Sequence, residues 1–208
     1  LLKHADMAMY EAKSMEGSNY RFFTEQMNNE ALDQSKLEIE LRHAMTNNEL
    51  TIFYQPRISL STGKIVGVES LLRWKHPSRG LLTPQQFITH AKQLGLISPI
   101  GYWSLEQISR DIQSMQILNI SPINISFNVA YEQFVAPKFV STVETILNSH
   151  GIDGSRFEFE LGENDFVSKL GDLSDDMSNL EKLGISFSLD DFGTGSTSLT
   201  QLQRLPIK

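Results

Sequence analysis

The sequence predicts an α/β fold of the (β/α)₈-barrel type. Segments with the alternating pattern of a strand recur with helical segments between them. Three polar residues at equivalent strand positions, Asn128, Glu160 and Asp190, lie 32 and 30 positions apart. That spacing fits one βα unit per repeat and therefore a parallel sheet. These strands are polar on one face, which favours a barrel over a doubly wound sheet, whose strands are usually apolar on both faces.

Composition and charge narrow the class of protein. The 208 residues are 40% hydrophobic and 21% charged, with a formal charge of −7. The charge argues against binding to polymeric nucleic acid, which needs a basic face. Cysteine is absent, so there is no disulfide framework. No apolar run approaches the ~20 residues needed to cross a bilayer. We therefore expect a cytoplasmic chain without membrane contact, with any membrane anchor outside this sequence.

The first 48 residues form a region of their own. Residues 1–15 have the pattern of an amphipathic helix, and residues 20–23 are predicted to form a short aromatic strand. Residues 25–48 are polar and helix-prone, and their apolar positions are spaced to lie on one face: Leu37, Leu41, Ala44 and Met45. We interpret residues 25–48 as a connecting helix and place the start of the main domain at residue 49.

The main domain is predicted to open with two strands and two helices. Residues 51–54 and 65–72 flank a Ser-Thr-Gly turn, which predicts an antiparallel pair. Thr83, Pro84 and Gln86 have the pattern of a helix N-terminus, and that helix is expected to end at Gly95. A longer helix is expected to follow, with apolar positions at Ile100, Trp103, Ile108, Ile112 and Met115.

The rest of the chain alternates three strands with two helices. Alternation of apolar and polar residues predicts strands at 122–129, 157–161 and 185–189. The intervening helices are predicted at about 138–149 and 172–183. Each of them is followed by a glycine, which accepts the left-handed conformation that closes a helix.

Oxygen-bearing side chains are expected to meet at one end of the barrel, where reactive groups lie in this fold. Four of them stand on the polar faces of separate strands, and Asp191 follows the last: Glu69, Asn128, Glu160 and Asp190. An all-oxygen set suits Mg²⁺ or Mn²⁺ rather than zinc. Converging carboxylates raise one another's pKa unless cations offset the repulsion. Two such ions sharing Asp190 would support a phosphoryl displacement, so the pattern predicts metal-assisted phosphodiester hydrolysis.

Each of these residues alone has a plainer interpretation. The adjacent aspartates could form a turn with a helix N-cap. Glu69 could be a salt-bridge partner at the rim, and Asn128 could be a turn or cap residue. Glu160 could pair with Arg156 or with a lysine. The coincidence of four polar side chains on four strands, all at the same end, favours the metal site.

Several motifs, in the right order, resemble those of EAL-domain cyclic-di-GMP phosphodiesterases. The resemblance runs from about residue 35 to the last residue. Its motifs are YQP at 54–56, ESLLRW at 69–74, NV at 128–129 with QF at 133–134, ELGE at 160–163, and DDFGTG at 190–195 followed by SL at 198–199. The resemblance implies a TIM-like barrel with an antiparallel first strand, often a dimer. It also implies cleavage of cyclic di-GMP to linear pGpG with two Mg²⁺ or Mn²⁺, in bacterial second-messenger signalling.

Roles for individual residues follow from the same resemblance. It implies that the metal ligands are Glu69, Asn128, Glu160, Asp190 and Asp191, and that the catalytic set is Glu69, Asp190 and Asp191. The implied substrate contacts are Gln55, Leu71 and Arg73. The planar guanidinium of Arg73 suits a pair of phosphate oxygens, and a surface ion pair is its plainer alternative. Glu163 is implied to steady the loop after Asp191, and a solvated loop charge is the alternative there.

Four positions depart from the family's usual residues without removing a ligand: Ser70 stands for Ala, Ala130 for Ser, Gly162 for Thr and Ser196 for an aromatic residue. The last two touch loops that shape the site, which points to reduced activity or altered dimer coupling. The family also places a catalytic-site lysine at position 211, beyond Lys208, and a later glutamate. We therefore expect residues 49–208 to be the N-terminal part of the EAL domain, a barrel incomplete at its C-terminus.

The N-terminal region has a resemblance of its own. Residues 5–13, with Asn19 and the aromatic segment 20–23, resemble the last helix and strand of a GGDEF diguanylate cyclase domain. We therefore interpret residues 1–24 as the C-terminal remnant of such a domain. A plain amphipathic helix is the alternative.

The leading hypothesis is therefore a cyclic-di-GMP phosphodiesterase. The runner-up is a catalytically inactive receptor or regulatory domain that binds cyclic di-GMP without cutting it. A third hypothesis is a purely structural partner domain, whose melting temperature neither nucleotide nor metal would shift.

Overall fold

The computed structural model describes residues 4–5, 8–9, 12, 20–117, 123–163, 173–191 and 193. The chain divides into two compact units, Leu1–Ala44 and Met45–Lys208, which are described here one at a time. Most of the predicted helix at 1–15, and the predicted turn beyond Gly193 with Ser196, lie outside the described residues.

The first unit is helical. The described residues between 4 and 12 are all in helix, and the His4 ring stacks on Phe23 with 3.9 Å between ring centroids. The predicted strand at 20–23 is wrong: these residues have no regular structure, because no described strand pairs with them, and Tyr20 and Phe22 are exposed. Helix α2 (Glu25–Ala44) confirms that this segment is helical, and it ends four residues earlier than expected.

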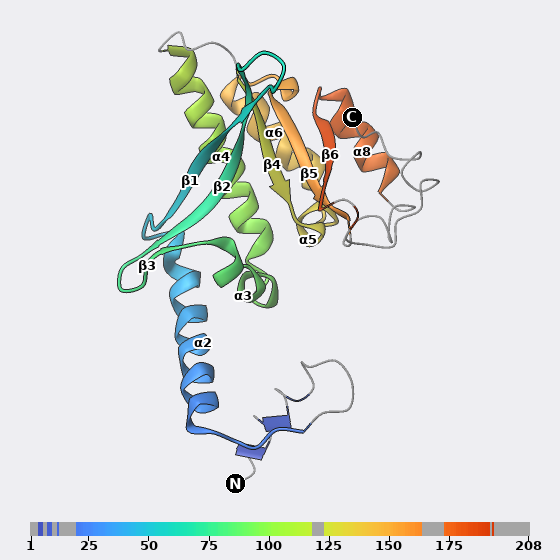
Figure 1. Cartoon of the computed structure of the whole chain (residues 1–208). Coiled ribbons are helices and arrows are strands. Elements are labelled where there is room, and N and C mark those ends of the chain that lie inside the picture. Colours follow the sequence, from blue (N-terminus) through green and yellow to red (C-terminus); the bar gives the residue numbers. More distant parts are fainter. Residues whose placement is uncertain are drawn as a thin grey trace. The chain divides into compact units, whose positions relative to one another are not determined.

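The second unit is built on a six-stranded mixed sheet (Figure 1). The strand order is β1-β2-β4-β5-β6, with β3 paired to β2. Strand β1 runs antiparallel to β2, as predicted, and β2, β4, β5 and β6 are parallel. The strands are β1 (Leu50–Ile58), β2 (Ile65–His76), β3 (Gly80–Leu82), β4 (Asn124–Val129), β5 (Phe157–Gly162) and β6 (Ser186–Asp190).

Three long helices lie against one face of this sheet (Figure 1). They are α4 (Ile97–Ile117), α6 (Phe139–His150) and α8 (Ser174–Lys182), close to their predicted positions. The helix predicted from residue 83 is instead split at Phe87 into a 3₁₀ turn, η1 (Pro84–Gln86), and α3 (Ile88–Gln93). Short elements that the sequence pattern did not predict are β3, α5 (Tyr131–Phe134) and the 3₁₀ turn η2 (Gly154–Arg156).

The hydrophobic core fills the space between the sheet and these helices. Phe127, Phe159 and Phe187 are in register on β4, β5 and β6 and are buried. Fully burying one such side chain stabilises the fold by about 2–3 kcal/mol. Because side chains alternate along a strand, the residues next to each phenylalanine along its strand point to the opposite face of the sheet. The core thereby fixes where the candidate site lies.

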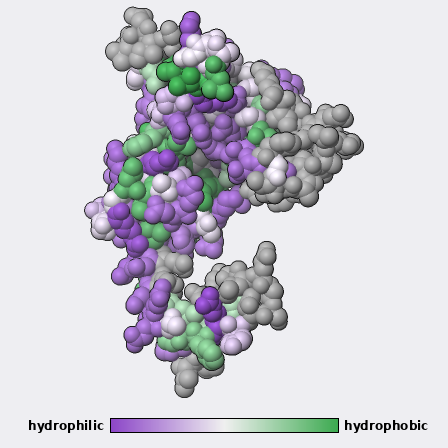
Figure 2. All heavy atoms as spheres, viewed as in Figure 1, coloured by the Kyte–Doolittle hydropathy of each residue, from purple (hydrophilic) through white to green (hydrophobic). Residues whose placement is uncertain are grey.

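The outer surface is mostly hydrophilic in the view of Figure 2, with apolar side chains exposed where the β1–β2 hairpin turns. Those side chains are Ile58, Leu60, Ile65 and Val66. Among the described helices, none has the length and apolarity to cross a bilayer.

Candidate functional site

Strand register places the predicted polar residues beside one another. Asn128 on β4 pairs with Glu160 on β5, and Gly162 pairs with Asp190 at the end of β6. Glu69 on β2 is level with Ser126 of β4, one inward position before Asn128. The parallel strands therefore carry Glu69, Asn128, Glu160 and Asp190 to the same edge of the sheet.

Contacts between these side chains show how closely they meet. Asn128 Nδ2 donates a hydrogen bond to Glu69 Oε1 at 3.2 Å. The pKa of Glu160 is raised, first by burial and then by the negative charges of Glu69 and Asp190, against the lowering effects of a Ser126 hydrogen bond and of Arg57. Three carboxylates from three strands thus share one electrostatic environment.

The turn after β6 is held by the carboxylate of Glu163, which directly follows β5. The Asp191 backbone has φ +56°, in the left-handed region, and its N–H donates to Asp190 Oδ1 at 2.9 Å. Two residues on, the Gly193 N–H donates to Glu163 Oε2 at 2.6 Å. Glu163 is 2% exposed, so the alternative of a solvated loop charge is wrong. A non-glycine residue at positive φ costs about 1–2 kcal/mol, and such strain points to a functional constraint.

The residues implied as substrate contacts lie on β1 and β2 beside Glu69. Gln55 is directly opposite Glu69 in the antiparallel pair and is exposed. Leu71 and Arg73 follow Glu69 at alternate positions and so share its face of β2. Arg73 Nη1 donates to the Leu72 carbonyl at 2.7 Å, and its guanidinium lies 5.9 Å from the centre of the Phe53 ring.

A further ion pair lies beside Glu160, which the sequence interpretation missed. Arg57 Nη1 is 2.7 Å from Glu158 Oε1 and 3.8 Å from Glu160 Oε1, and it also hydrogen-bonds to Ser126 Oγ. The described cation near Glu160 is therefore Arg57, not Arg156 or a lysine as considered from the sequence. Strand alternation could have predicted that Arg57 faces the site, because Arg57 is two residues after Gln55 and shares its face of β1.

Within the described part of the chain, no three His, Cys, Asp or Glu side chains are close enough together to form a metal-binding group as they stand. Glu69 and Asn128, two members of the predicted ligand set, are joined by a hydrogen bond between their side chains. Every predicted ligand bears a side-chain oxygen and none bears sulfur or imidazole, which is the chemistry of sites for hard divalent cations.

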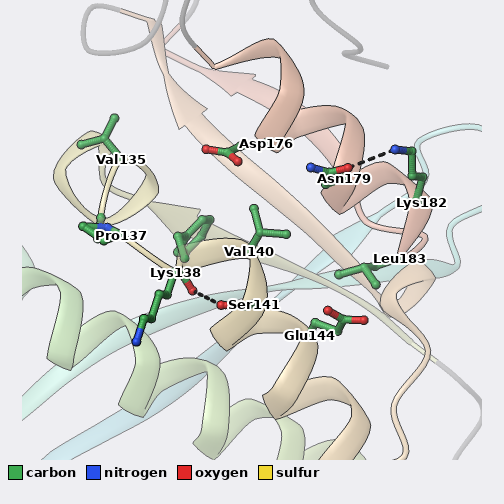
Figure 3. Close-up of a pocket in the computed structure, with 12 residues that line it drawn as sticks. Val135, Pro137, Lys138, Val140, Ser141, Glu144, Asp176, Asn179, Lys182 and Leu183 are labelled. Atoms are coloured by element: carbon green, nitrogen blue, oxygen red, sulfur yellow. Dashed lines mark hydrogen bonds between the residues drawn. The ribbon is translucent and has the colours of Figure 1, made fainter.

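A pocket of about 600 Å³ lies elsewhere, between the segment before α6, α6 itself and α8 (Figure 3). Its wall includes apolar and charged side chains of both signs, among them Val140, Lys138, Glu144 and Asp176. None of the predicted site residues lines it. The pocket is therefore separate from the carboxylates at the strand ends.

Comparison with known proteins identifies the family. Residues 38–208 match the EAL domain.

The chain belongs to the EAL domain family.

Its curated relatives include two proteins of Pseudomonas aeruginosa. Over 206 residues it is 36% identical to the bifunctional diguanylate cyclase/cyclic di-GMP phosphodiesterase MucR, covering 99% of this chain and 30% of MucR. Over 207 residues it is 32% identical to the cyclic di-GMP phosphodiesterase NbdA, covering 100% of this chain and 26% of NbdA. The chain thus spans about a quarter to a third of the length of these relatives.

Solved EAL structures have the same fold. A complex of the PaMucR phosphodiesterase with c-di-GMP superposes with a TM-score of 0.79 at 35% identity, covering 83% of this chain and 70% of that one. The EAL enzyme Bd1971, in a form with cAMP and cyclic-di-GMP bound, gives a TM-score of 0.77 at 31% identity, covering 86% and 50%. Solved EAL domains are TIM-like barrels, so the predicted fold class is confirmed.

Proposed function

We propose that this EAL domain is a metal-dependent phosphodiesterase that hydrolyses cyclic di-GMP to linear pGpG with two Mg²⁺ or Mn²⁺ ions. The observation that carries the proposal is the meeting of Glu69, Asn128, Glu160 and Asp190 at one sheet edge. The names of two relatives above 30% identity, MucR and NbdA, supply the substrate class.

The residues present fit a divalent cation. Burial and two neighbouring carboxylates raise the pKa of Glu160, and a bound cation would relieve that repulsion. The amide nitrogen of Asn128 donates a hydrogen bond to Glu69 Oε1. Rotating this amide would present its oxygen instead, because the two ends of the group are close to the same size. After that rotation every predicted ligand would present a side-chain oxygen, as a hard divalent cation requires.

The protein's own groups have separable tasks in this proposal. When bound, the metal ions supply charge neutralisation and activation of water for an in-line displacement. Glu69, Asn128, Glu160, Asp190 and Asp191 would hold the ions. Gln55, Leu71 and Arg73 would orient the dinucleotide, with the Arg73 fork suited to two phosphate oxygens. Glu163 would hold the turn that presents Asp191, through its bond to the Gly193 N–H.

The test is turnover of cyclic di-GMP by the purified full-length protein with Mn²⁺, followed by chromatography of the products. We expect pGpG to form and the rate to fall at least about 100-fold in Glu69→Ala, because a metal ligand is lost. Glu144→Gln is the matched control and should retain activity, because Glu144 lines the separate pocket beside α6 and α8. Absence of turnover at every Mn²⁺ or Mg²⁺ concentration would count against the proposal.

A receptor that binds cyclic di-GMP without cutting it is the second candidate. One observation favours it: the described carboxylates do not form a ready metal-binding group of three. Calorimetry with cyclic di-GMP, run beside the product assay, separates the two functions. Binding without product in the presence of either metal identifies the receptor.

We also propose that residues 1–24 are the end of a GGDEF domain and that the protein acts in the cytoplasm, with a homodimer formed through the EAL domain. The alignment with MucR, whose name includes a diguanylate cyclase, covers 99% of this chain and so extends into this region. Light scattering of the purified protein tests the dimer. A cyclase assay on the full-length protein tests the GGDEF assignment.

A further inference from the structure

Two glutamates share the inward face of β5, and one guanidinium lies between them. Glu158 and Glu160 are two residues apart on the strand, so their side chains point the same way. Arg57 Nη1 is 2.7 Å from Glu158 Oε1 and 3.8 Å from Glu160 Oε1. Arg57 therefore hydrogen-bonds to Glu158 and makes a longer ion pair with Glu160.

The side chains around Glu158 favour its closer contact with Arg57. Its carboxylate accepts hydrogen bonds from Ser126 Oγ, at 3.2 Å, and from Ser188, in addition to Arg57. Arg57 therefore lies closer to Glu158, at 2.7 Å, than to Glu160, at 3.8 Å. The side chains around Glu158 hold the guanidinium on that carboxylate.

We propose that Glu158 is a positioning residue of the metal site, which holds the Arg57 guanidinium away from Glu160 and so keeps the Glu160 oxygens free for a divalent cation. This inference rests on the proposed metal-dependent function. It adds a residue that acts through Arg57 rather than by contact with metal or substrate.

The physical reason is competition for one carboxylate. Arginine pairs strongly with carboxylates through parallel N–H···O bonds. Arg57 is already within 4 Å of Glu160, so it needs only a small movement to bond there if Glu158 loses its charge. A guanidinium on Glu160 would occupy ligand oxygens and place a positive charge beside the incoming cation. Both effects oppose metal binding.

The experiment is calorimetric titration of the purified protein with Mn²⁺ in the absence of nucleotide. We expect Glu158→Gln to weaken Mn²⁺ binding by about tenfold, which corresponds to about 1.4 kcal/mol. Adding Arg57→Met to that variant removes the competing guanidinium and should restore the affinity to within about twofold of the wild type. Glu144→Gln makes the same chemical change on the outer surface and should bind Mn²⁺ as the wild type does. Melting curves establish that each variant is folded.

The outcomes separate this inference from the function on which it rests. If the wild type binds no Mn²⁺, the proposed metal site fails. If the wild type binds Mn²⁺ but Glu158→Gln binds it equally well, or if the double variant stays as weak as the single one, the positioning role is overturned. If Glu158→Gln does not fold, Arg57→Met alone decides. We expect the Arg57→Met variant to bind Mn²⁺ at least as tightly as the wild type. If the Arg57–Glu158 ion pair only supports the fold, the variant will bind Mn²⁺ more weakly.

Discussion

Glu163, the buried glutamate that follows β5, anchors the turn after β6. Its Oε2 accepts a hydrogen bond from the Gly193 N–H at 2.6 Å, and it is 2% exposed. The turn that it anchors contains Asp191 at φ +56° and Gly193 at φ +92°. We expect Glu163→Gln and Glu163→Ala to loosen this turn and to lower turnover of cyclic di-GMP.

The magnitude follows from the strength of a charge-assisted hydrogen bond. Such a bond contributes about 1.5–3 kcal/mol, so its complete loss in Glu163→Ala, at about 2 kcal/mol, shifts the turn's equilibrium by about 30-fold. Glu163→Gln retains an amide oxygen as acceptor without the charge. Neutral hydrogen bonds are about half as strong, so we expect a loss of about 1 kcal/mol, or roughly fivefold.

The assay is the rate of pGpG formation at saturating cyclic di-GMP and Mn²⁺, with a melting curve for each variant. Glu132→Gln is the matched control, because Glu132 follows β4 at the same end of the sheet and makes a partly exposed ion pair with Lys92 at 3.2 Å. Exposed pairs of this kind contribute about 0–1 kcal/mol. Unchanged rates in both Glu163 variants, or equal losses in the Glu132 control, would refute the argument that Glu163 acts through the turn.

Three further predictions test the site and its framework. Because the folded-state pKa of Glu160 is raised above the ordinary value of 4.5, its contribution to stability is full below pH ~4.5 and is lost as the pH rises through the higher folded-state value. Metal-free Glu160→Gln should therefore melt at a higher temperature than the wild type at neutral pH, and equal melting temperatures there would contradict this. Tyr54→Phe removes the 2.6 Å hydrogen bond from the Tyr54 hydroxyl to Asp111 Oδ2 and should lower the free energy of unfolding by about 1.5 kcal/mol, measured by urea denaturation. Phe159→Ala, at a fully buried position of β5, should cost about 3–5 kcal/mol in the same assay, and a loss below 1 kcal/mol would mean that this row is not the core.

Strand alternation predicted most of the sheet, because its signal is local. Phe127, Phe159 and Phe187 are buried on one face of the sheet, so Glu160 lies on the opposite face. This alternation can be read from the sequence of each strand by itself. The predicted strand at 20–23 fails for the same reason. Aromatic residues give a strand pattern, but a strand also needs a partner, and no local pattern supplies one.

For the candidate site, the sequence predicted which face of its strand each residue occupies, but not the contacts between distant strands. The sequence placed Glu69, Asn128, Glu160 and Asp190 on polar faces, and parallel register put them at one edge. The bond between Arg57 and Glu158 joins residues 101 positions apart. It depends on how β1 and β5 are arranged across the sheet, and a local sequence pattern carries no information on that arrangement.

The most direct test of the central claim is a crystal structure of the protein with Mn²⁺ and cyclic di-GMP, using the anomalous signal of manganese. The account predicts anomalous peaks bounded by side-chain oxygens of Glu69, Asn128, Glu160 and Asp190, next to the dinucleotide phosphate. A structure with cyclic di-GMP bound and no manganese among those four side chains, at Mn²⁺ concentrations that saturate activity, would contradict it.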